Sequence, residues 1–482
     1  MSSATARLNG EAVVGSVDDA TSGELSPRER RGLVRRIADQ VGSTVSSKVQ
    51  AASDAGRPMS TEAEKVASST EIQQAMRAEN EARLRAGLEP FTFGAHEALV
   101  DQVMAHVYGL GELEVLWNHP DVENIDVNGP DEVWVTFVGG RKQRWAPIAE
   151  TEADLLELIR RVARRLGLVE VDFDARHPQL DVQLPDGSRL AAVFGGTATN
   201  GLAPTPYLCI RRHRYLDLGA DDLVGLGLWP QASCDFTVAW FRSGGNVIVA
   251  GDWNAGKTTA LRGLCHSAIP PWHRVVTVEA RITELGLHRS GRLPNVVALF
   301  SRPPGAEGEG EVTVQDLVSR TTRRLNPTRV IIGEVLGDEV GAVLDVFSGS
   351  TRGSACTIHA SSARDTIQRF EQYGLAARPP MPPDAIRYAL AQATPLIVHL
   401  AGDESTDGAL RRYVTSIIEV TGLEDGHVAA TELWGLDDSG ELVPRHALSM
   451  AKRQRLATAG WDWLTDGWGP QLPVGAANGE LR

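Results

Sequence analysis

The stretch Gly251-Asp-Trp-Asn-Ala-Gly256-Lys257-Thr258 decides the fold. It fits Gly-x-x-x-x-Gly-Lys-[Ser/Thr], a pattern in which small residues let a loop curl until its backbone N–H groups point at a phosphate. An apolar run, residues 246–250, leads into the loop, and a helical pattern, residues 258–265, leads out of it. A helix that begins at such a loop also offers its positive dipole end to an anion. We therefore predict that residues 251–258, the phosphate loop, bind a nucleotide.

The expected nucleotide-binding residues in and after this loop are Gly251, Asn254, Ala255, Gly256, Lys257, Thr258 and Thr259. The pattern assigns the β- and γ-phosphate oxygens of ATP to Lys257 and Mg²⁺ to the Thr258 hydroxyl. Lysine is rare in this chain, because only five of the 48 basic residues are Lys and the other 43 are Arg. The Lys at position 257 therefore supports the prediction that this loop binds phosphate.

Polar side chains also follow three other apolar runs. The run 329–334 ends in Glu334, the run 274–279 ends in Glu279 with Glu284 shortly after, and the run 355–359 ends in His359. In open α/β sheets, ligands bind outside the carboxyl ends of the strands. We predict that Glu334 holds Mg²⁺ with Thr258 or orients the attacking water. Glu279 or Glu284 is the alternative base, and His359 either senses the γ-phosphate or is structural.

The rest of the chain divides by composition and periodicity. Strands are expected at 124–127, 132–138, 179–184, 189–194 and 207–211, and helices at 96–108 and 151–166. Further strands are expected at 246–250, 274–279, 329–334, 355–359, 396–400 and 416–420, and their continuous apolar character is typical of a parallel sheet buried on both faces. The expected organisation is a disordered tail (1–25), a helical extension of surface helices (26–90), a smaller α+β domain (91–215), a linker (216–229), an α/β domain (230–450) and a polar C-terminal tail (451–482).

Charge and composition exclude several classes of protein. The chain has 482 residues and a net charge of −14, which argues against a protein that coats nucleic acid or anionic lipid. Its four dispersed cysteines form no Cys-x-x-Cys pair, so we expect a reducing compartment and no zinc site. It contains no apolar run of 18 residues and no signal peptide, so we expect a cytoplasmic protein.

From about residue 91 to residue 425, the sequence resembles the type II/IV secretion ATPases. The resemblance is strongest to the CpaF-like branch, which powers tight-adherence pilus assembly, and the type IV secretion ATPases are relatives. Besides the phosphate loop and the segments around Glu334 and His359, it rests on Tyr108-Gly-Leu-Gly-Glu-Leu-Glu-Val-Leu, Asp121-Val-Glu-Asn-Ile-Asp-Val-Asn-Gly-Pro130, Pro178-Gln-Leu-Asp-Val-Gln-Leu-Pro-Asp-Gly-Ser-Arg189, Ile210-Arg211-Arg212 and Gly310-Glu-Val-Thr-Val-Gln-Asp-Leu-Val.

The resemblance implies a RecA-like P-loop ATPase domain behind the α+β domain, assembled as a homohexamer that hydrolyses ATP with Mg²⁺. It implies a motor that acts through an inner-membrane platform protein and is held peripherally at the inner face of the membrane by that partner. It also implies arginines that help to bind phosphate, for which the candidates are Arg189, Arg211 and Arg320.

The chain departs from the family pattern at three places. Trp253-Asn254 replaces the common Thr-Gly, the acidic box Glu279-Ala-Arg-Ile-Thr-Glu284 has one extra residue and lacks a second acid after Glu279, and Leu336 stands where Arg is common. Two alternatives to the motor stay open. The altered acidic box leaves a scaffold that binds ATP with little or no turnover. Because similar motors move DNA, a DNA translocase or conjugation-type motor is the second alternative, against which the acidic charge argues.

Overall fold

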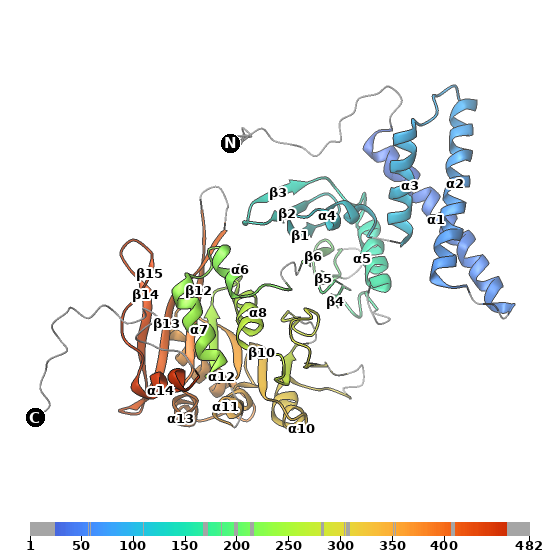
Figure 1. The fold of residues 1–482 in the computed structure, drawn as a ribbon. Coiled ribbons are helices and arrows are strands. Elements are labelled where there is room, and N and C mark those ends of the chain that lie inside the picture. The colour runs from blue at the N-terminus through green and yellow to red at the C-terminus, as the bar shows by residue number, and fades with distance from the viewer. Residues whose placement is uncertain are drawn as a thin grey trace, which may run out of the picture. The chain divides into compact units, whose positions relative to one another are not determined.

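The computed structural model describes residues 25–459, apart from positions 56, 58, 109, 167–171, 185, 197–200, 213–215, 281–283, 303, 305–308, 350, 352 and 406–409. The predicted tail 1–25 and the end of the chain beyond 459 therefore lie almost entirely outside the described residues. The chain folds as two compact units: the first runs to residue 212, and the second comprises residues 139–141 and the chain from 213 onward (Figure 1).

Three helices open the first unit: α1 (Pro27–Asp54), α2 (Thr61–Arg85) and α3 (Phe93–Tyr108). Helix α1 begins at a capping box, in which Ser26 Oγ accepts from the N–H of Glu29 and the Glu29 carboxylate accepts from the N–H of Ser26. The three helices share an apolar core formed by Leu33, Val34, Ile37, Ala38, Val41, Val45, Ile72, Met76, Leu99, Val103 and Val107.

This packing corrects the expectation of surface helices. The apolar residues of α1 are sparse, but at positions 33, 34, 37, 38, 41 and 45 they recur on one face of the helix. The face is covered by α2 and α3, so the predicted boundary at residue 90 falls between helices that share one core.

A six-stranded antiparallel sheet completes the first unit, in the order β3-β2-β1-β6-β5-β4. Its strands are β1 (Val122–Asn128), β2 (Val133–Phe137), β3 (Lys142–Trp145), β4 (Gln179–Gln183), β5 (Arg189–Val193) and β6 (Tyr207–Arg211). Helix α5 (Glu152–Leu166) packs its apolar stripe against the sheet. A 3-10 turn, Gly111–Leu113, and the short helix α4 (Glu114–Asn118) come before β1 in the chain. The predicted strands are present, whereas β3 was missed because its residues, Lys-Gln-Arg-Trp, are mostly polar.

The second unit contains a nine-stranded sheet in the order β15-β14-β13-β12-β7-β11-β10-β8-β9. Strands β12, β7, β11, β10, β8 and β9 run parallel, and β13, β14 and β15 add antiparallel partners beyond β12. Their bounds are β7 (Val247–Gly251), β8 (Val275–Glu279), β9 (Val296–Phe300), β10 (Arg329–Val335), β11 (Ala355–His359), β12 (Leu396–Glu404), β13 (Leu410–Glu424), β14 (His427–Leu436) and β15 (Leu442–Pro444). The predicted α/β class is therefore confirmed.

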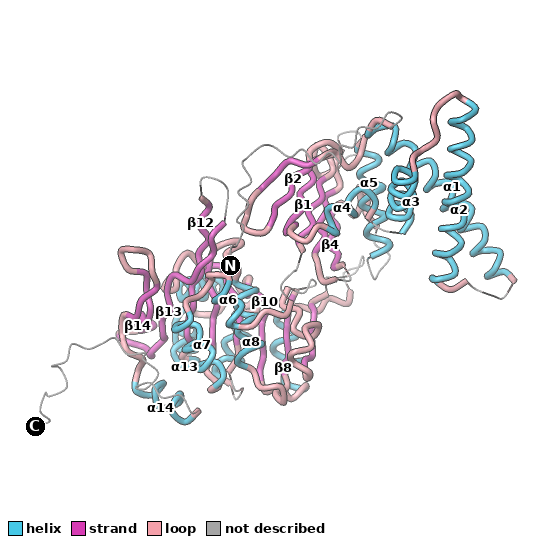
Figure 2. Tube along the Cα trace, turned by 45° about the horizontal axis from the view of Figure 1, so that its top comes forward, coloured by secondary structure: helices cyan, strands magenta, loops and turns pink. Residues whose placement is uncertain are grey.

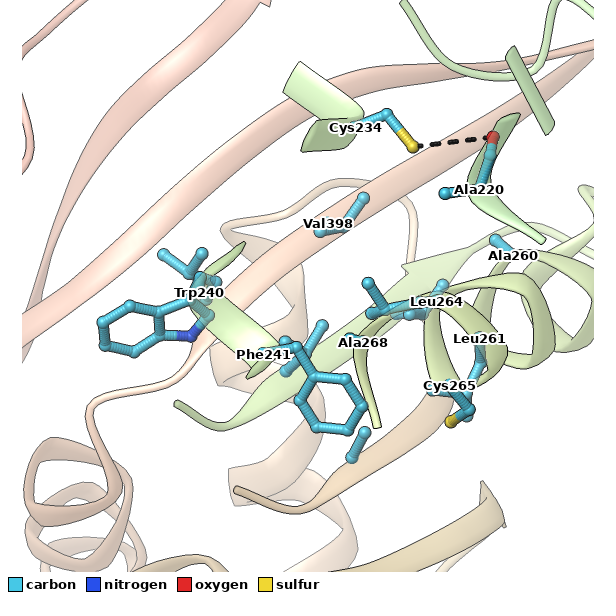
Figure 3. Close-up of a cluster of buried hydrophobic side chains, with 14 of the residues drawn as sticks. Ala220, Cys234, Trp240, Phe241, Ala260, Leu261, Leu264, Cys265, Ala268 and Val398 are labelled. Atoms are coloured by element: carbon cyan, nitrogen blue, oxygen red, sulfur yellow. Dashed lines mark hydrogen bonds between the residues drawn. The ribbon is translucent and has the colours of Figure 1, made fainter. Parts of the chain in front are cut away.

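Helices cover both faces of this sheet (Figure 2). One layer consists of α6 (Ala220–Gly225), α7 (Gln231–Arg242) and α8 (Lys257–Ala268), and Figure 3 shows α7 and α8 side chains such as Trp240, Phe241 and Leu264 packed with Val398 of β12. The other layer consists of α11 (Val340–Ser348), α12 (Asp365–Ala376) and α13 (Pro383–Ala393). Between β9 and β10 lie the short helices α9 (Val314–Asp316) and α10 (Thr322–Arg324), joined by a π-helical turn, Leu317–Thr321.

Near the end of the described residues the chain forms helix α14 (Met450–Thr458), where a polar tail was expected. Its buried Leu456 belongs to the same core as Trp240, and its buried Lys452 donates to the carbonyl of Val420 and pairs with Glu419 at 3.4 Å. Burial lowers the pKa of the Lys452 amine. The polar composition thus did not reveal this helix, which is held to the domain by one buried apolar residue and one buried ion pair.

Lys452→Ala is expected to lower the free energy of unfolding by about 3 kcal/mol, because it leaves Glu419 buried without its cation. Chemical denaturation measures the change, and Gln454→Ala on the same helix is the matched control, because Gln454 is exposed. Equal stability of Lys452→Ala and the control would contradict the anchoring role.

No helix among the described residues is long and apolar enough to cross a membrane.

Candidate nucleotide-binding site

The phosphate loop joins β7 to α8, and each of its two glycines is required by the backbone. A Cβ on Gly251 would lie 2.2 Å from the carbonyl oxygen of Leu400 on the neighbouring strand β12. Gly256, at the N-cap of α8, has a φ of 88°, a backbone conformation that residues with a Cβ atom disfavour. Between them Asn254 has a φ of 60°, in the left-handed region that Asn tolerates better than most residues. The sequence therefore folds locally into a tight loop in front of a helix.

The loop places the first residues of α8 at the carboxyl end of the parallel strands. Within the loop, the side chain of Ala255 is buried in the core, and Thr258 and Thr259 lie half-buried in the first turn of α8. Helix α8 is twelve residues long, so its N-terminal N–H groups carry the partial positive charge that favours a phosphate. The described residues thus fit a nucleotide phosphate chain, as the sequence pattern predicts.

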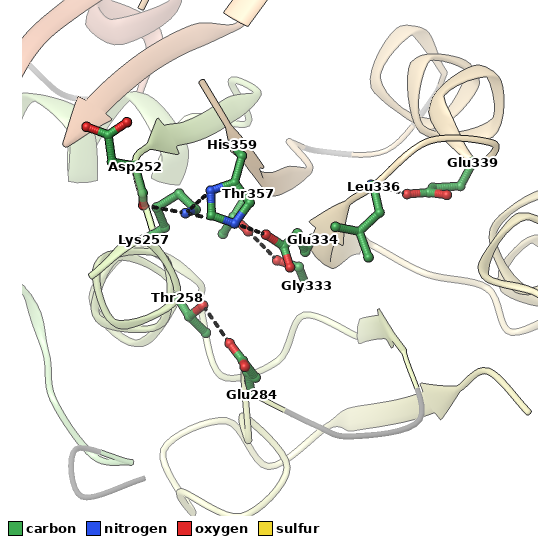
Figure 4. Close-up of polar contacts among 10 residues, drawn as sticks. All are labelled: Asp252, Lys257, Thr258, Glu284, Gly333, Glu334, Leu336, Glu339, Thr357 and His359. Atoms are coloured by element: carbon green, nitrogen blue, oxygen red, sulfur yellow. Dashed lines mark hydrogen bonds and ion pairs between the residues drawn. The ribbon is translucent and has the colours of Figure 1, made fainter. Parts of the chain in front are cut away.

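Lys257, His359 and Glu334 form one connected chain of polar contacts (Figure 4). Lys257 Nζ donates to the carbonyl of Asp252 at 2.8 Å and lies 3.0 Å from His359 Nδ1, while His359 Nε2 lies 2.9 Å from Glu334 Oε1. An ammonium can only donate, so Nδ1 accepts and Nε2–H donates to the carboxylate. Partial burial, and then the charge of Lys257, lower the pKa of His359, in agreement with this neutral form.

The register of the sheet explains why these side chains meet. His359 lies opposite Gly251 in the pairing of β11 with β7, and Glu334 lies at the end of β10, the next strand. The structure thus brings Lys257, His359 and Glu334 together, as their strand-end positions predict.

The two acids that the sequence left as alternative bases occupy different positions. Glu279 is only 4% exposed, and its Oε2 accepts from the N–H of Glu284 at 2.6 Å and from the N–H of Leu285 at 2.8 Å. Arg262 donates to the carbonyls of the same two residues. The Thr258 hydroxyl, in turn, donates to Glu284 Oε2 at 3.3 Å. Glu284 therefore faces the loop, and Glu279 holds the segment that carries it.

The three candidate arginines are not gathered around the phosphate loop by any described contact. Arg320, on the π-helical turn, is 80% exposed and lies 3.8 Å from Asp316. Arg189 and Arg211 belong to the other unit, where they lie opposite each other on β5 and β6, and Arg189 pairs with both oxygens of Asp181. Their phosphate-binding role stays a prediction.

One residue beside the loop was not predicted from the sequence. Arg412 on β13 donates from Nε to the carbonyl of Asn254 at 2.8 Å and from Nη2 to Asn254 Oδ1 at 3.4 Å. It reaches the loop because β12 lies between β7 and β13 in the sheet. No sequence motif marks such a residue, because only the antiparallel pairing of β12 with β13 places it there.

The chain is similar to several known proteins. Residues 109–405 match the family described as Type II/IV secretion system protein. A Mycobacterium tuberculosis protein named for conjugal transfer is 32% identical over 336 residues, which cover 68% of this chain and 89% of that protein. The type IV secretion system protein VirB11 of Brucella suis is 25% identical over 328 residues, which cover 63% and 88% of the two chains. The solved Legionella pneumophila ATPase DotB aligns with a TM-score of 0.46 at 15% identity, over 64% of this chain and 79% of that one.

Proposed function

The chain belongs to the family of type II/IV secretion system proteins, and from that premise we propose that it is an ATP-hydrolysing motor for pilus assembly or protein secretion. The observation that carries the proposal is the Lys257–His359–Glu334 chain at the end of the phosphate loop. It joins a phosphate-binding cation to a carboxylate through a neutral imidazole. This arrangement suits the reaction of ATP with water to give ADP and phosphate.

Each residue of the site has a distinct part in this proposal. The loop amides, the start of α8 and Lys257 bind the phosphates. The Thr258 hydroxyl, with Glu334 or Glu284, holds Mg²⁺, which when bound neutralises charge on the phosphate oxygens. Glu334 accepts from His359 Nε2–H, so one oxygen of its carboxylate is oriented by the protein. Such a group can orient the attacking water.

The branch, oligomeric state, location and partner are inferred from the resemblance described in the sequence analysis. We place the protein in the CpaF-like branch, as a homohexamer at the cytoplasmic face of the membrane, acting on an inner-membrane platform protein. The similarity to a protein named for conjugal transfer keeps a DNA-translocating motor as the rival, against which the net charge of −14 argues.

A steady-state ATPase assay with size analysis, each with and without Mg²⁺-ATP, tests the proposal. We expect phosphate release and a species of six subunits. ATP binding without phosphate release, even with the platform protein present, would instead indicate a scaffold. Turnover that is stimulated by DNA, together with salt-sensitive DNA binding, would indicate the translocase.

Arg412→Ala is expected to raise the KM for ATP about fivefold with kcat changed by less than about twofold, because it removes about 1 kcal/mol of hydrogen bonding that holds the left-handed Asn254. Steady-state kinetics over a range of ATP concentrations measure both constants. Arg411→Ala is the matched control, since Arg411 is exposed and lies over the ring of Tyr413 instead. A KM equal to that of the wild type would contradict the role of Arg412.

A further inference from the structure

We propose that Trp253 is a positioning residue of the nucleotide site, which holds the imidazole of His359 in the plane that joins Lys257 to Glu334. The inference rests on the proposed ATPase function and extends it to a residue of the phosphate loop that the Gly-x-x-x-x-Gly-Lys-[Ser/Thr] pattern leaves open.

The geometry of the two rings carries the proposal. The indole of Trp253 is stacked on the imidazole of His359, with ring centroids 4.2 Å apart and an interplanar angle of 27°. Trp253 is nevertheless 83% exposed, so it adds little to the core of the protein. The contact that its indole makes is therefore the stack on His359, a geometry that aromatic rings favour.

The orientation of His359 is what the stack can control. Both ring nitrogens are engaged, Nδ1 with Lys257 at 3.0 Å and Nε2 with Glu334 at 2.9 Å, so a rotated ring loses both contacts. The terminal torsion of a histidine side chain has broad minima and restricts the ring only weakly. A flat aromatic surface stacked on the imidazole restricts the values that this torsion angle can take. Trp253 thereby acts on Glu334 and Lys257 through His359.

The backbone of the loop gives Trp253 this position without depending on it. The curl of the loop is set by the close approach of Gly251 to Leu400 and by the positive φ values of Asn254 and Gly256. Removal of the indole should therefore leave the loop and its phosphate-binding amides in place. The expected consequence is a slower chemical step with unchanged nucleotide binding.

Steady-state kinetics of Trp253→Ala and Trp253→Phe give the first test. In Trp253→Ala, kcat should fall about tenfold, the rate equivalent of the upper value of an aromatic pair, while the KM for ATP changes by less than about twofold. Phe also stacks, so Trp253→Phe should retain at least about half of the wild-type kcat. Trp272→Ala is the matched control, because Trp272 is 77% exposed and touches His273 edge-on, at 6.3 Å between ring centroids, just before β8.

Tryptophan emission gives a second test that does not depend on turnover. When phosphates draw Lys257 away from His359, the hydrogen bonding and charge of the ring beneath Trp253 change. A non-hydrolysable ATP analogue with Mg²⁺ should therefore alter the emission of the wild type and of Trp272→Phe, but not of Trp253→Phe. The comparison by single substitution is needed because the chain contains 11 tryptophans.

Two results would overturn the proposal. The first is a kcat of Trp253→Ala equal to that of the wild type. The second is an analogue-induced emission change in Trp253→Phe as large as that of the wild type. A wild type that binds the analogue but releases no phosphate would contradict the proposed function alone, and the emission comparison would still decide the role of Trp253. A wild type that does not bind the analogue at all would contradict both.

Discussion

Lys257→Ala is expected to reduce ATP turnover at least about a hundredfold and to weaken ATP binding, with the fold unchanged. Lys257 is the positive side chain of the phosphate loop, and its ammonium contacts both the carbonyl of Asp252 and His359 Nδ1. Alanine removes the charge and the donor together. The loop itself is set by Gly251 and Gly256, so its backbone should persist.

Phosphate release and titration calorimetry with ATP measure the two effects, and circular dichroism on heating checks the fold. Lys48→Ala is the matched control, because Lys48 is a half-exposed surface lysine that pairs with Glu71 in the helical part of the first unit. Turnover in Lys257→Ala equal to that of the control would refute the assignment of the phosphate loop as the ATP site.

The parts of the site that follow from local chemistry were predictable from the sequence. The phosphate loop needs small residues, a Lys and a hydroxyl at fixed spacing, and these stand together in the chain. Glu334 and His359 were identified because each ends an apolar run, and parallel strands bring their carboxyl ends to one edge of the sheet.

The parts that depend on packing were not predictable. Spacing could not decide between Glu279 and Glu284, because the burial of Glu279 against the N–H groups of Glu284 and Leu285 is set by the path of the chain after β8. Arg412 lies 158 residues from Asn254 and reaches it through the order of the strands alone. No local pattern encodes that order.

For the fold, too, the packing of helices near both ends of the described chain was not predictable from the sequence. The helices α1, α2 and α14 have mostly polar sequences, and their periodicity or composition suggested surface or tail. Helices α1 and α2 nevertheless bury narrow apolar stripes against each other and α3, and α14 buries Leu456 together with the Lys452–Glu419 ion pair. Whether so few inward residues find partners depends on the tertiary structure.

Glu334→Gln is expected to lower kcat at least about a hundredfold while ATP binding stays within about threefold of the wild type. Glutamine keeps the size of the side chain and an oxygen that can accept from His359 Nε2–H, so the Lys257–His359 contact should survive. It removes the negative charge that orients the attacking water in the proposed function. Single-turnover and steady-state phosphate release, compared with ATP binding by calorimetry, separate the chemical step from affinity.

Glu284→Gln is the informative comparison, because Glu284 presents a carboxylate that accepts from the Thr258 hydroxyl. If Glu334 is the activating acid, Glu284→Gln should retain more turnover than Glu334→Gln and should raise the concentration of Mg²⁺ needed for half-maximal rate. The reverse order, with Glu334→Gln active and Glu284→Gln inactive, would assign the water to Glu284. The His359 contact would then serve to hold Lys257 rather than the base.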